Sequence, residues 1–224
     1  MDKSSWKYKI AEQIVSSYKE FKKSSKNKSE DCIMSYHIFE NVVIKELLWH
    51  ATTMIEGKKV IASGKNKGNY YEKDKKEKEM INIKIVGQRY WTKDAMEKYK
   101  KNNKEEKDYR IVDGLIHEHA VPRNIIKQKI IDNLESTDLY DDECINKVFN
   151  IIRDLSKSVV ITKDEDKKLN KAGRRQKMPE NWDGKDWKAR YRLEDKEIEI
   201  YGINKEDYNK DFKKHLLNKL KSIK

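Results

Sequence analysis

The chain has 224 residues, of which 40% are charged and 36% are hydrophobic. Its 51 Lys and Arg residues outnumber its 39 Asp and Glu residues, and the formal net charge is +12. The only two cysteines, Cys32 and Cys144, exclude a disulfide scaffold and a CxxC zinc ribbon. The sequence has no apolar signal core near its start and no run long enough for a membrane span. We therefore expect a cytoplasmic protein without membrane contacts.

The positive charge favours a polyanionic partner, because binding to nucleic-acid phosphates releases condensed counterions. Both signs of charge are interspersed along the chain, so a solvated lysine-rich surface is the alternative interpretation.

Apolar residues at helical spacing predict a first helix over residues 6–21 and a second over residues 36–57. The second predicted helix contains His37 and His50, and we interpret each as a helix-surface or core histidine and not as a metal ligand. Residues 64–79 carry glycines and mixed charges without an apolar period, which predicts an exposed loop.

Thr92 is a predicted N-cap for a short helix, and Trp91 before it is expected in the core. Residues 109–121 are rich in apolar and β-branched types and predict a strand that ends at Pro122. Two amphipathic helices are predicted next, from two apolar stripes: Ile126, Ile130 and Leu134 in the first, and Ile145, Val148, Phe149, Ile152 and Leu155 in the second.

Residues 158–162 predict a short strand that leads directly into a helix. Thr162 and Glu165 have the spacing of a capping box at the start of that helix. Residues 196–202 alternate as a strand does, and a last helix is predicted over residues 204–220.

The stretch GLIHEHAVPRN, residues 114–124, places two of the five histidines around a glutamate. A zinc-protease helix would need histidines four residues apart, but Val121 stands where the second one belongs. Pro122 also prevents a helix from continuing through the next turn. On a strand, by contrast, His117 and His119 lie on one face and Glu118 on the other.

The motif Glu118-His119-Ala120-Val121-Pro122 resembles the first motif of the HNH nucleases, the ββα-metal or His-Me finger superfamily. In that superfamily a strand carries the acidic residue and the histidine, and a second strand leads into a helix with another metal ligand. The predicted strand, cap and helix at residues 158–171 occur in the matching order.

The resemblance implies His119 as the general base and Arg123 as a phosphate-holding residue. It implies Glu118 and Asp166 as ligands of a divalent metal, Mg²⁺ or alternatively Mn²⁺. Three further residues are expected to support this site by hydrogen bonds: His117, Asn124 and Asn170. A transition-metal site on His117 and His119 is the alternative.

The hairpin implied by the resemblance is expanded by residues 120–157, and the zinc-binding cysteines of many superfamily members are absent. Downstream of the predicted metal helix, residues 170–192 interleave basic and aromatic side chains, as a phosphate-binding groove requires. Trp187 and Tyr191 are expected in the core. The predicted nucleic-acid-binding residues are Arg174, Arg175, Lys177 and Arg190.

The sequence thus predicts a mainly helical α+β protein with an embedded ββα-metal unit. An N-terminal helical region, residues 1–108, precedes a nuclease region, residues 109–224, and the two are expected to form one compact domain. The predicted function is metal-dependent cleavage of double-stranded DNA, in a restriction or defence role, with homodimers allowed. The alternatives are a non-catalytic nucleic-acid-binding protein and an interaction or inhibitor protein.

Overall fold

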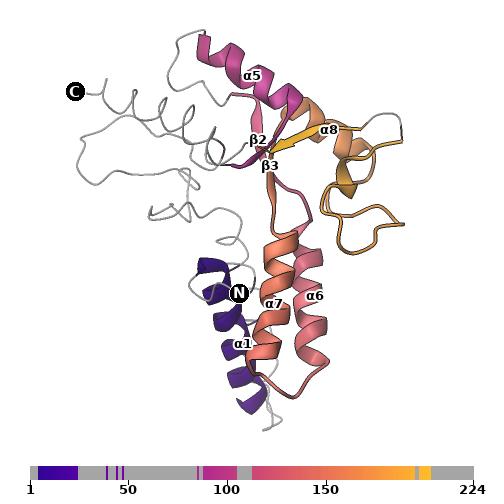
Figure 1. The fold of residues 1–224 in the computed structure, drawn as a ribbon. Coiled ribbons are helices and arrows are strands. Elements are labelled where there is room, and N and C mark those ends of the chain that lie inside the picture. The colour runs from indigo at the N-terminus through magenta and orange to yellow at the C-terminus, as the bar shows by residue number, and fades with distance from the viewer. Residues whose placement is uncertain are drawn as a thin grey trace, which may run out of the picture. The chain divides into compact units, whose positions relative to one another are not determined.

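A computed structural model gives the structure of the protein (Figure 1). It describes residues 5–24, 39, 44, 47, 85, 88–104, 113–194 and 197–202. The predicted loop over residues 64–79 and the predicted last helix lie outside the described residues, as does most of the predicted second helix, including His37 and His50. The described part is α+β, with five α-helices and a four-stranded mixed sheet.

The chain divides into two compact units, and each takes segments from several parts of the sequence. The first unit comprises residues 1–53, 119–157 and 173–190. The second unit comprises residues 54–118, 158–172 and 191–224. Each unit therefore draws on both sides of the boundary that the sequence predicts after residue 108.

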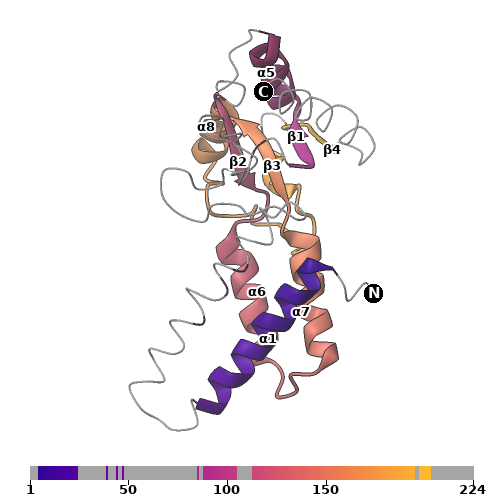
Figure 2. The same cartoon turned by 90° about the vertical axis from the view of Figure 1, so that its left-hand side faces the viewer.

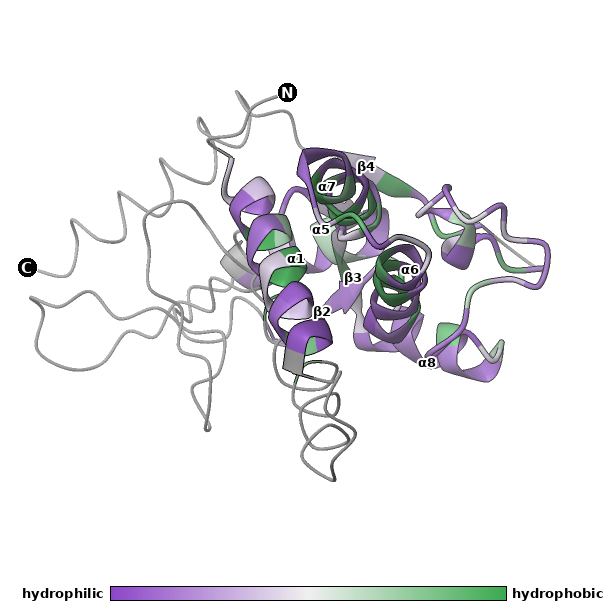
Figure 3. Ribbon diagram, turned by 90° about the horizontal axis from the view of Figure 1, so that it is seen from below, coloured by the Kyte–Doolittle hydropathy of each residue, from purple (hydrophilic) through white to green (hydrophobic). Residues whose placement is uncertain are grey.

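Three helices form the described core of the first unit: α1 (Trp6–Ser24), α6 (Arg123–Glu135) and α7 (Asp142–Leu155). Helix α7 contacts both α1 and α6 (Figures 1 and 2). Seen from below, the ribbons of α1, α6 and α7 each carry both hydrophobic and hydrophilic stretches (Figure 3). The predicted apolar stripes are confirmed, because these side chains are buried in one cluster: Ile10, Ile14, Tyr18, Ile126, Ile130, Leu134, Val148, Phe149, Ile152 and Leu155. Ile145, also predicted in the second stripe, is partly buried and packs against this cluster.

Local sequence explains where α7 begins. The Asp141 side chain caps the helix by accepting hydrogen bonds from the backbone N–H groups of Glu143 and Cys144, at 3.0 and 3.1 Å. Asp142 and Glu143 place negative charge in the first turn, and Arg153 places positive charge in the last, which suits the helix dipole.

The four strands are β1 (Tyr90–Thr92), β2 (Leu115–His119), β3 (Ser158–Thr162) and β4 (Ile200–Gly202), in the order β2-β3-β1-β4 (Figure 2). Strand β1 pairs in parallel with β3 and antiparallel with β4. All five residues of β3 are buried, as expected of a strand with neighbours on both sides.

Strands β2 and β3 are hydrogen-bonded neighbours. Backbone hydrogen bonds flank the pair at both ends, from Ala120 N–H to the Lys157 carbonyl at 3.0 Å and from Lys163 N–H to the Gly114 carbonyl at 2.9 Å. The two residue numbers add to the same value in both bonds, as an antiparallel ladder without a bulge requires. The two strands are therefore antiparallel, as the hairpin implied by the resemblance requires, and the register places Glu118 opposite Val159.

Helices α5 (Lys93–Lys104) and α8 (Lys163–Lys171) belong to the second unit. Helix α5 follows β1 directly, and Thr92 accepts a hydrogen bond from the Ala95 N–H at 3.2 Å, as the predicted N-cap should. Trp91 is fully buried, as predicted, in a cluster with Ala95, Leu115 and Val160.

The predicted capping box of α8 is confirmed, since Thr162 and Glu165 each accept from the other's backbone N–H. Within the described part of the chain, no helix is long and apolar enough to cross a membrane.

Candidate functional site

The histidine–glutamate–histidine stretch lies on a strand, which agrees with the sequence prediction and excludes a zinc-protease helix. Along β2, Leu115 and His117 are buried, whereas Ile116 and Glu118 on the other face are half-buried. His119, the last residue of the strand, is also half-buried.

Strand β2 lies at the edge of the described sheet, so half of its backbone N–H and C=O groups face away from any described strand. In the antiparallel register with β3, the even-numbered residues of β2 point their N–H and C=O groups at the partner strand, as Ala120 does beyond the strand's end. The odd-numbered residues point these groups outward. The carbonyl of His119 therefore needs a hydrogen-bond donor from outside the sheet.

Arg190 supplies that donor. Its Nη1 donates to the His119 carbonyl at 2.6 Å, its Nε to the Arg174 carbonyl at 2.6 Å and its Nη2 to the Arg175 carbonyl at 2.9 Å. One planar guanidinium thus holds three carbonyl oxygens within roughly 8 Å of one another. The predicted general base and two predicted phosphate-binding arginines lie on backbone segments that this side chain joins.

The same observation corrects the sequence interpretation of Arg190. Its side chain is only 1% exposed, and its donors point at main-chain carbonyls. It is therefore not available for the phosphate contact predicted from the sequence. The composition of the basic segment cannot distinguish an arginine that holds backbone from one that faces solvent, because both occur among the same neighbours.

The remaining basic residues of the prediction differ in exposure. Arg175 and Lys177 are exposed, whereas Arg174 is half-buried. Arg123 is half-buried at the first position of α6, directly after Pro122, and Asn124 beside it is exposed. Cations in these positions can meet an anion in solution, and the dipole at the start of α6 favours negative charge there.

Two aromatic residues of the basic segment pack as predicted. Tyr191 is buried with 1% exposure, and Trp187 packs against the core of the first unit. Trp182, also packed against that core, donates from its indole nitrogen to the Asp186 carbonyl at 2.8 Å.

The two predicted metal ligands come from the second unit. Glu118 lies on β2, and Asp166 is half-buried in the first turns of α8. Asn170, predicted to support the site, donates its side-chain amide to the Asp166 carboxylate at 3.1 Å. Carboxylate oxygens are the donors that Mg²⁺ prefers, so these two residues fit such an ion chemically.

Among the described residues, no group of three or more His, Cys, Asp and Glu side chains is arranged to hold a metal. This is compatible with Mg²⁺, which commonly binds through one or two carboxylates and keeps several waters. Glu165, by contrast, has a structural role. Its Oε2 accepts hydrogen bonds from the backbone and hydroxyl of Thr162 and from the Thr92 hydroxyl, at 2.8, 2.9 and 2.8 Å.

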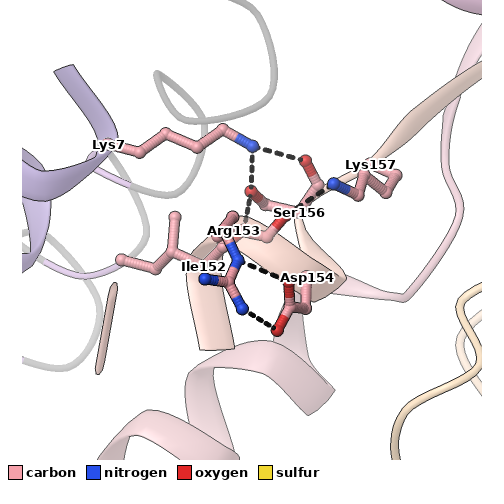
Figure 4. A network of polar contacts seen from close by, with 6 residues as sticks. All are labelled: Lys7, Ile152, Arg153, Asp154, Ser156 and Lys157. Atoms are coloured by element: carbon pink, nitrogen blue, oxygen red, sulfur yellow. Dashed lines mark hydrogen bonds and ion pairs between the residues drawn. The ribbon is translucent and has the colours of Figure 1, made fainter. Parts of the chain in front are cut away.

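A polar network that the sequence did not reveal joins α1 to the end of α7 (Figure 4). The Lys7 ammonium donates to the Ser156 carbonyl at 3.3 Å and to the Ser156 hydroxyl at 3.1 Å. That hydroxyl in turn donates to the Ile152 carbonyl. No spacing or motif distinguishes Lys7 from the other lysines of the first helix, so the sequence carries no signal for it.

The pKa of Lys7 is lowered to about 7, mainly by burial and further by the neighbouring cation of Lys157. The carboxylate of Asp154 opposes this shift, but Arg153 already holds it through two hydrogen bonds at 2.7 and 2.8 Å. The network continues toward the candidate site, because the Lys157 carbonyl accepts the backbone N–H of Ala120.

Comparison of the chain with protein-family models, with curated proteins and with solved structures finds no match.

Proposed function

We propose that the protein is a metal-dependent endonuclease of the HNH type that cleaves DNA. The observation that carries the proposal is the hydrogen bonding of Arg190, which ties the backbone of His119 to that of Arg174 and Arg175. Phosphodiester cleavage requires a base and cations that hold the phosphate in one place, and these three residues supply both.

Three further observations support the proposal. The strand that carries Glu118 and His119 pairs antiparallel with β3, and β3 leads through the Thr162 cap into the helix that carries Asp166. This strand–strand–helix order is the one that the HNH resemblance implies. The net charge of +12 suits a nucleic-acid substrate.

In the proposed mechanism His119 accepts a proton from the attacking water, which a neutral imidazole can do near neutral pH. Arg123, Arg174 and Arg175 hold the phosphates that flank the cleaved bond. A divalent ion bound by Glu118 and Asp166 would stabilise charge on the phosphate and on the departing oxygen.

Incubation of purified protein with supercoiled plasmid tests the proposal. We expect nicked and linear products with Mg²⁺ or Mn²⁺ and none in EDTA. Absence of cleavage with every divalent ion tried, together with salt-dependent DNA binding in a gel shift, would instead identify a non-catalytic nucleic-acid-binding protein.

A further inference from the structure

The turn that follows α8 concentrates positive charge at the surface. Residues 171–177, KAGRRQK, contain four cations and no carboxylate. Arg175, Gln176 and Lys177 are exposed, and Arg174 is half-buried. Neither arginine nor Lys177 forms an ion pair with another described residue. Within the described part of the chain, the charge of this turn is therefore not neutralised by a carboxylate.

Arg190 sets the direction of the backbone in this turn. Its buried guanidinium donates to the carbonyls of Arg174 and Arg175, at 2.6 and 2.9 Å, so both carbonyls point inward. The peptide groups that contain these carbonyls also contain the N–H groups of Arg175 and Gln176. No described peptide bond is cis, and in a trans peptide the N–H points opposite to the C=O. Two consecutive N–H groups therefore point away from Arg190, at two exposed residues.

These two N–H groups are available to a ligand. Neither of them donates a hydrogen bond within the described part of the chain. Arg190 also makes both of them stronger donors, because a hydrogen bond to a carbonyl polarises the whole peptide group. Consecutive main-chain N–H groups that point to the same side form an anion-binding concavity.

A phosphate group suits this arrangement. Its oxygens can accept from both N–H groups at once, while the flanking arginines supply the opposite charge. Hydrogen bonds to an ionised acceptor are roughly twice as strong as those between neutral groups. Main-chain contacts to phosphate read no base, so the nucleotide sequence should not matter at this turn.

We propose that the main-chain N–H groups of Arg175 and Gln176 bind a phosphate of the nucleic-acid backbone. The proposal rests on the proposed function for the nucleic acid as the source of this phosphate. It adds two main-chain donors to the contacts assigned to the side chains of Arg174 and Arg175. It also gives Arg190 a positioning role at the site, although its own side chain does not face the phosphate.

Amide NMR spectra of the full chain in EDTA test the proposal, with inorganic phosphate and a short DNA duplex as the probes. Sodium chloride keeps the ionic strength constant during both titrations. We expect both probes to move the amide proton resonances of Arg175 and Gln176 downfield, as new hydrogen bonds to an anion do. The amides of Lys22 and Lys23 on α1 are the controls and should move little, because basic side chains alone do not engage the main chain. Unchanged resonances of Arg175 and Gln176 in the presence of the duplex would overturn the proposal.

A pair of variants at Gln176 separates the main chain from the side chain. Gln176→Pro and Gln176→Ala both lose the glutamine side chain, but only proline lacks the N–H. We expect the proline variant to bind the duplex at least about tenfold more weakly than the alanine variant, as loss of one hydrogen bond to a charged group causes. Equal affinities of the two folded variants would overturn the proposal. If the proline variant does not fold, the amide shifts of the wild type decide alone.

The outcome is separate from that of the nuclease proposal, because EDTA removes the metal that cleavage needs. Amide shifts at this turn in a protein that cleaves no DNA in Mg²⁺ would support the phosphate site and contradict only the nuclease. Cleavage in Mg²⁺ without amide shifts would contradict only the phosphate site.

Discussion

The guanidinium of Arg190 donates a hydrogen bond to the main-chain carbonyl of His119 over 2.6 Å. This carbonyl points away from the partner strand at the edge of the described sheet. The bond fixes the end of the strand and joins it to the segment that carries Arg174 and Arg175.

Replacement of Arg190 should destabilise the protein strongly. Arg190→Met leaves three carbonyls without their shared donor, so we expect the free energy of unfolding to fall by about 3 kcal/mol. Arg190→Lys should recover little of this loss, because an ammonium cannot reproduce the planar fork. Urea denaturation measures both variants.

Arg192→Met is the matched control for this prediction. Arg192 is exposed, and its 3.8 Å ion pair with Glu197 is also exposed, so the change should cost less than about 0.5 kcal/mol. Similar losses for Arg190→Met and Arg192→Met would show that the buried guanidinium has no special role.

Loss of the Glu165 carboxylate should destabilise the start of α8. Glu165→Ala removes an acceptor shared by Thr92 and Thr162, and we expect a loss of about 2–3 kcal/mol in urea denaturation. Asp164→Ala removes a neighbouring carboxylate whose ion pair with Lys167 is exposed, and it should cost less than about 1 kcal/mol. The reverse ranking would contradict the capping role of Glu165.

Lys7 should make the stability of the protein depend on pH above neutrality. Its pKa falls from 10.5 to about 7 on folding, so between these values the unfolded chain binds a proton that the folded chain does not. The free energy of unfolding should therefore rise with pH across this window, and the penalty for the buried charge should be full below pH 7.

Lys7→Met tests this dependence by removing the titrating group. At pH 6 the variant should exceed the wild type by roughly 1–3 kcal/mol, and the difference should shrink toward pH 10. Lys9→Met, an exposed neighbour on the same helix, should change little at either pH. A pH-independent difference between wild type and Lys7→Met would exclude titration as its cause.

Arg174 and Arg175 should contribute to DNA affinity without regard to sequence. Replacing both with Ala should reduce the slope of log affinity against log salt by about 2, since each phosphate contact contributes about one unit. Lys22→Ala with Lys23→Ala on α1 removes the same net charge and should leave the slope nearly unchanged. Equal slopes for the two double variants would show that Arg174 and Arg175 make no phosphate contacts.

Much of the described fold follows from sequence pattern. Apolar periodicity located α1, α6 and α7, and cap chemistry located the starts of α5 and α8, because both signals are local. The parallel pairing of β1 with β3 was not predicted. Strand β1 has three residues, too few for periodicity to reveal it, and its partner lies far along the chain.

In the candidate site too, features set by neighbouring residues could be predicted from the sequence, and features set by tertiary packing could not. The position of His119 on a strand before Pro122 could be predicted, because alternation and proline act locally. The buried roles of Arg190 and Lys7 could not, since each depends on carbonyls that only tertiary packing brings near. In the sequence alone, Arg190 and Lys7 cannot be told apart from arginines and lysines that face solvent.

The most direct test of the central claim is the plasmid cleavage rate of His119→Ala in Mg²⁺, measured beside the wild type at equal DNA occupancy. The variant keeps the main-chain carbonyl that Arg190 binds, so it should fold and bind DNA normally. Cleavage should fall at least about 10²-fold, as removal of a general base usually causes. Wild-type cleavage by the folded variant would contradict the assignment of His119 as the base.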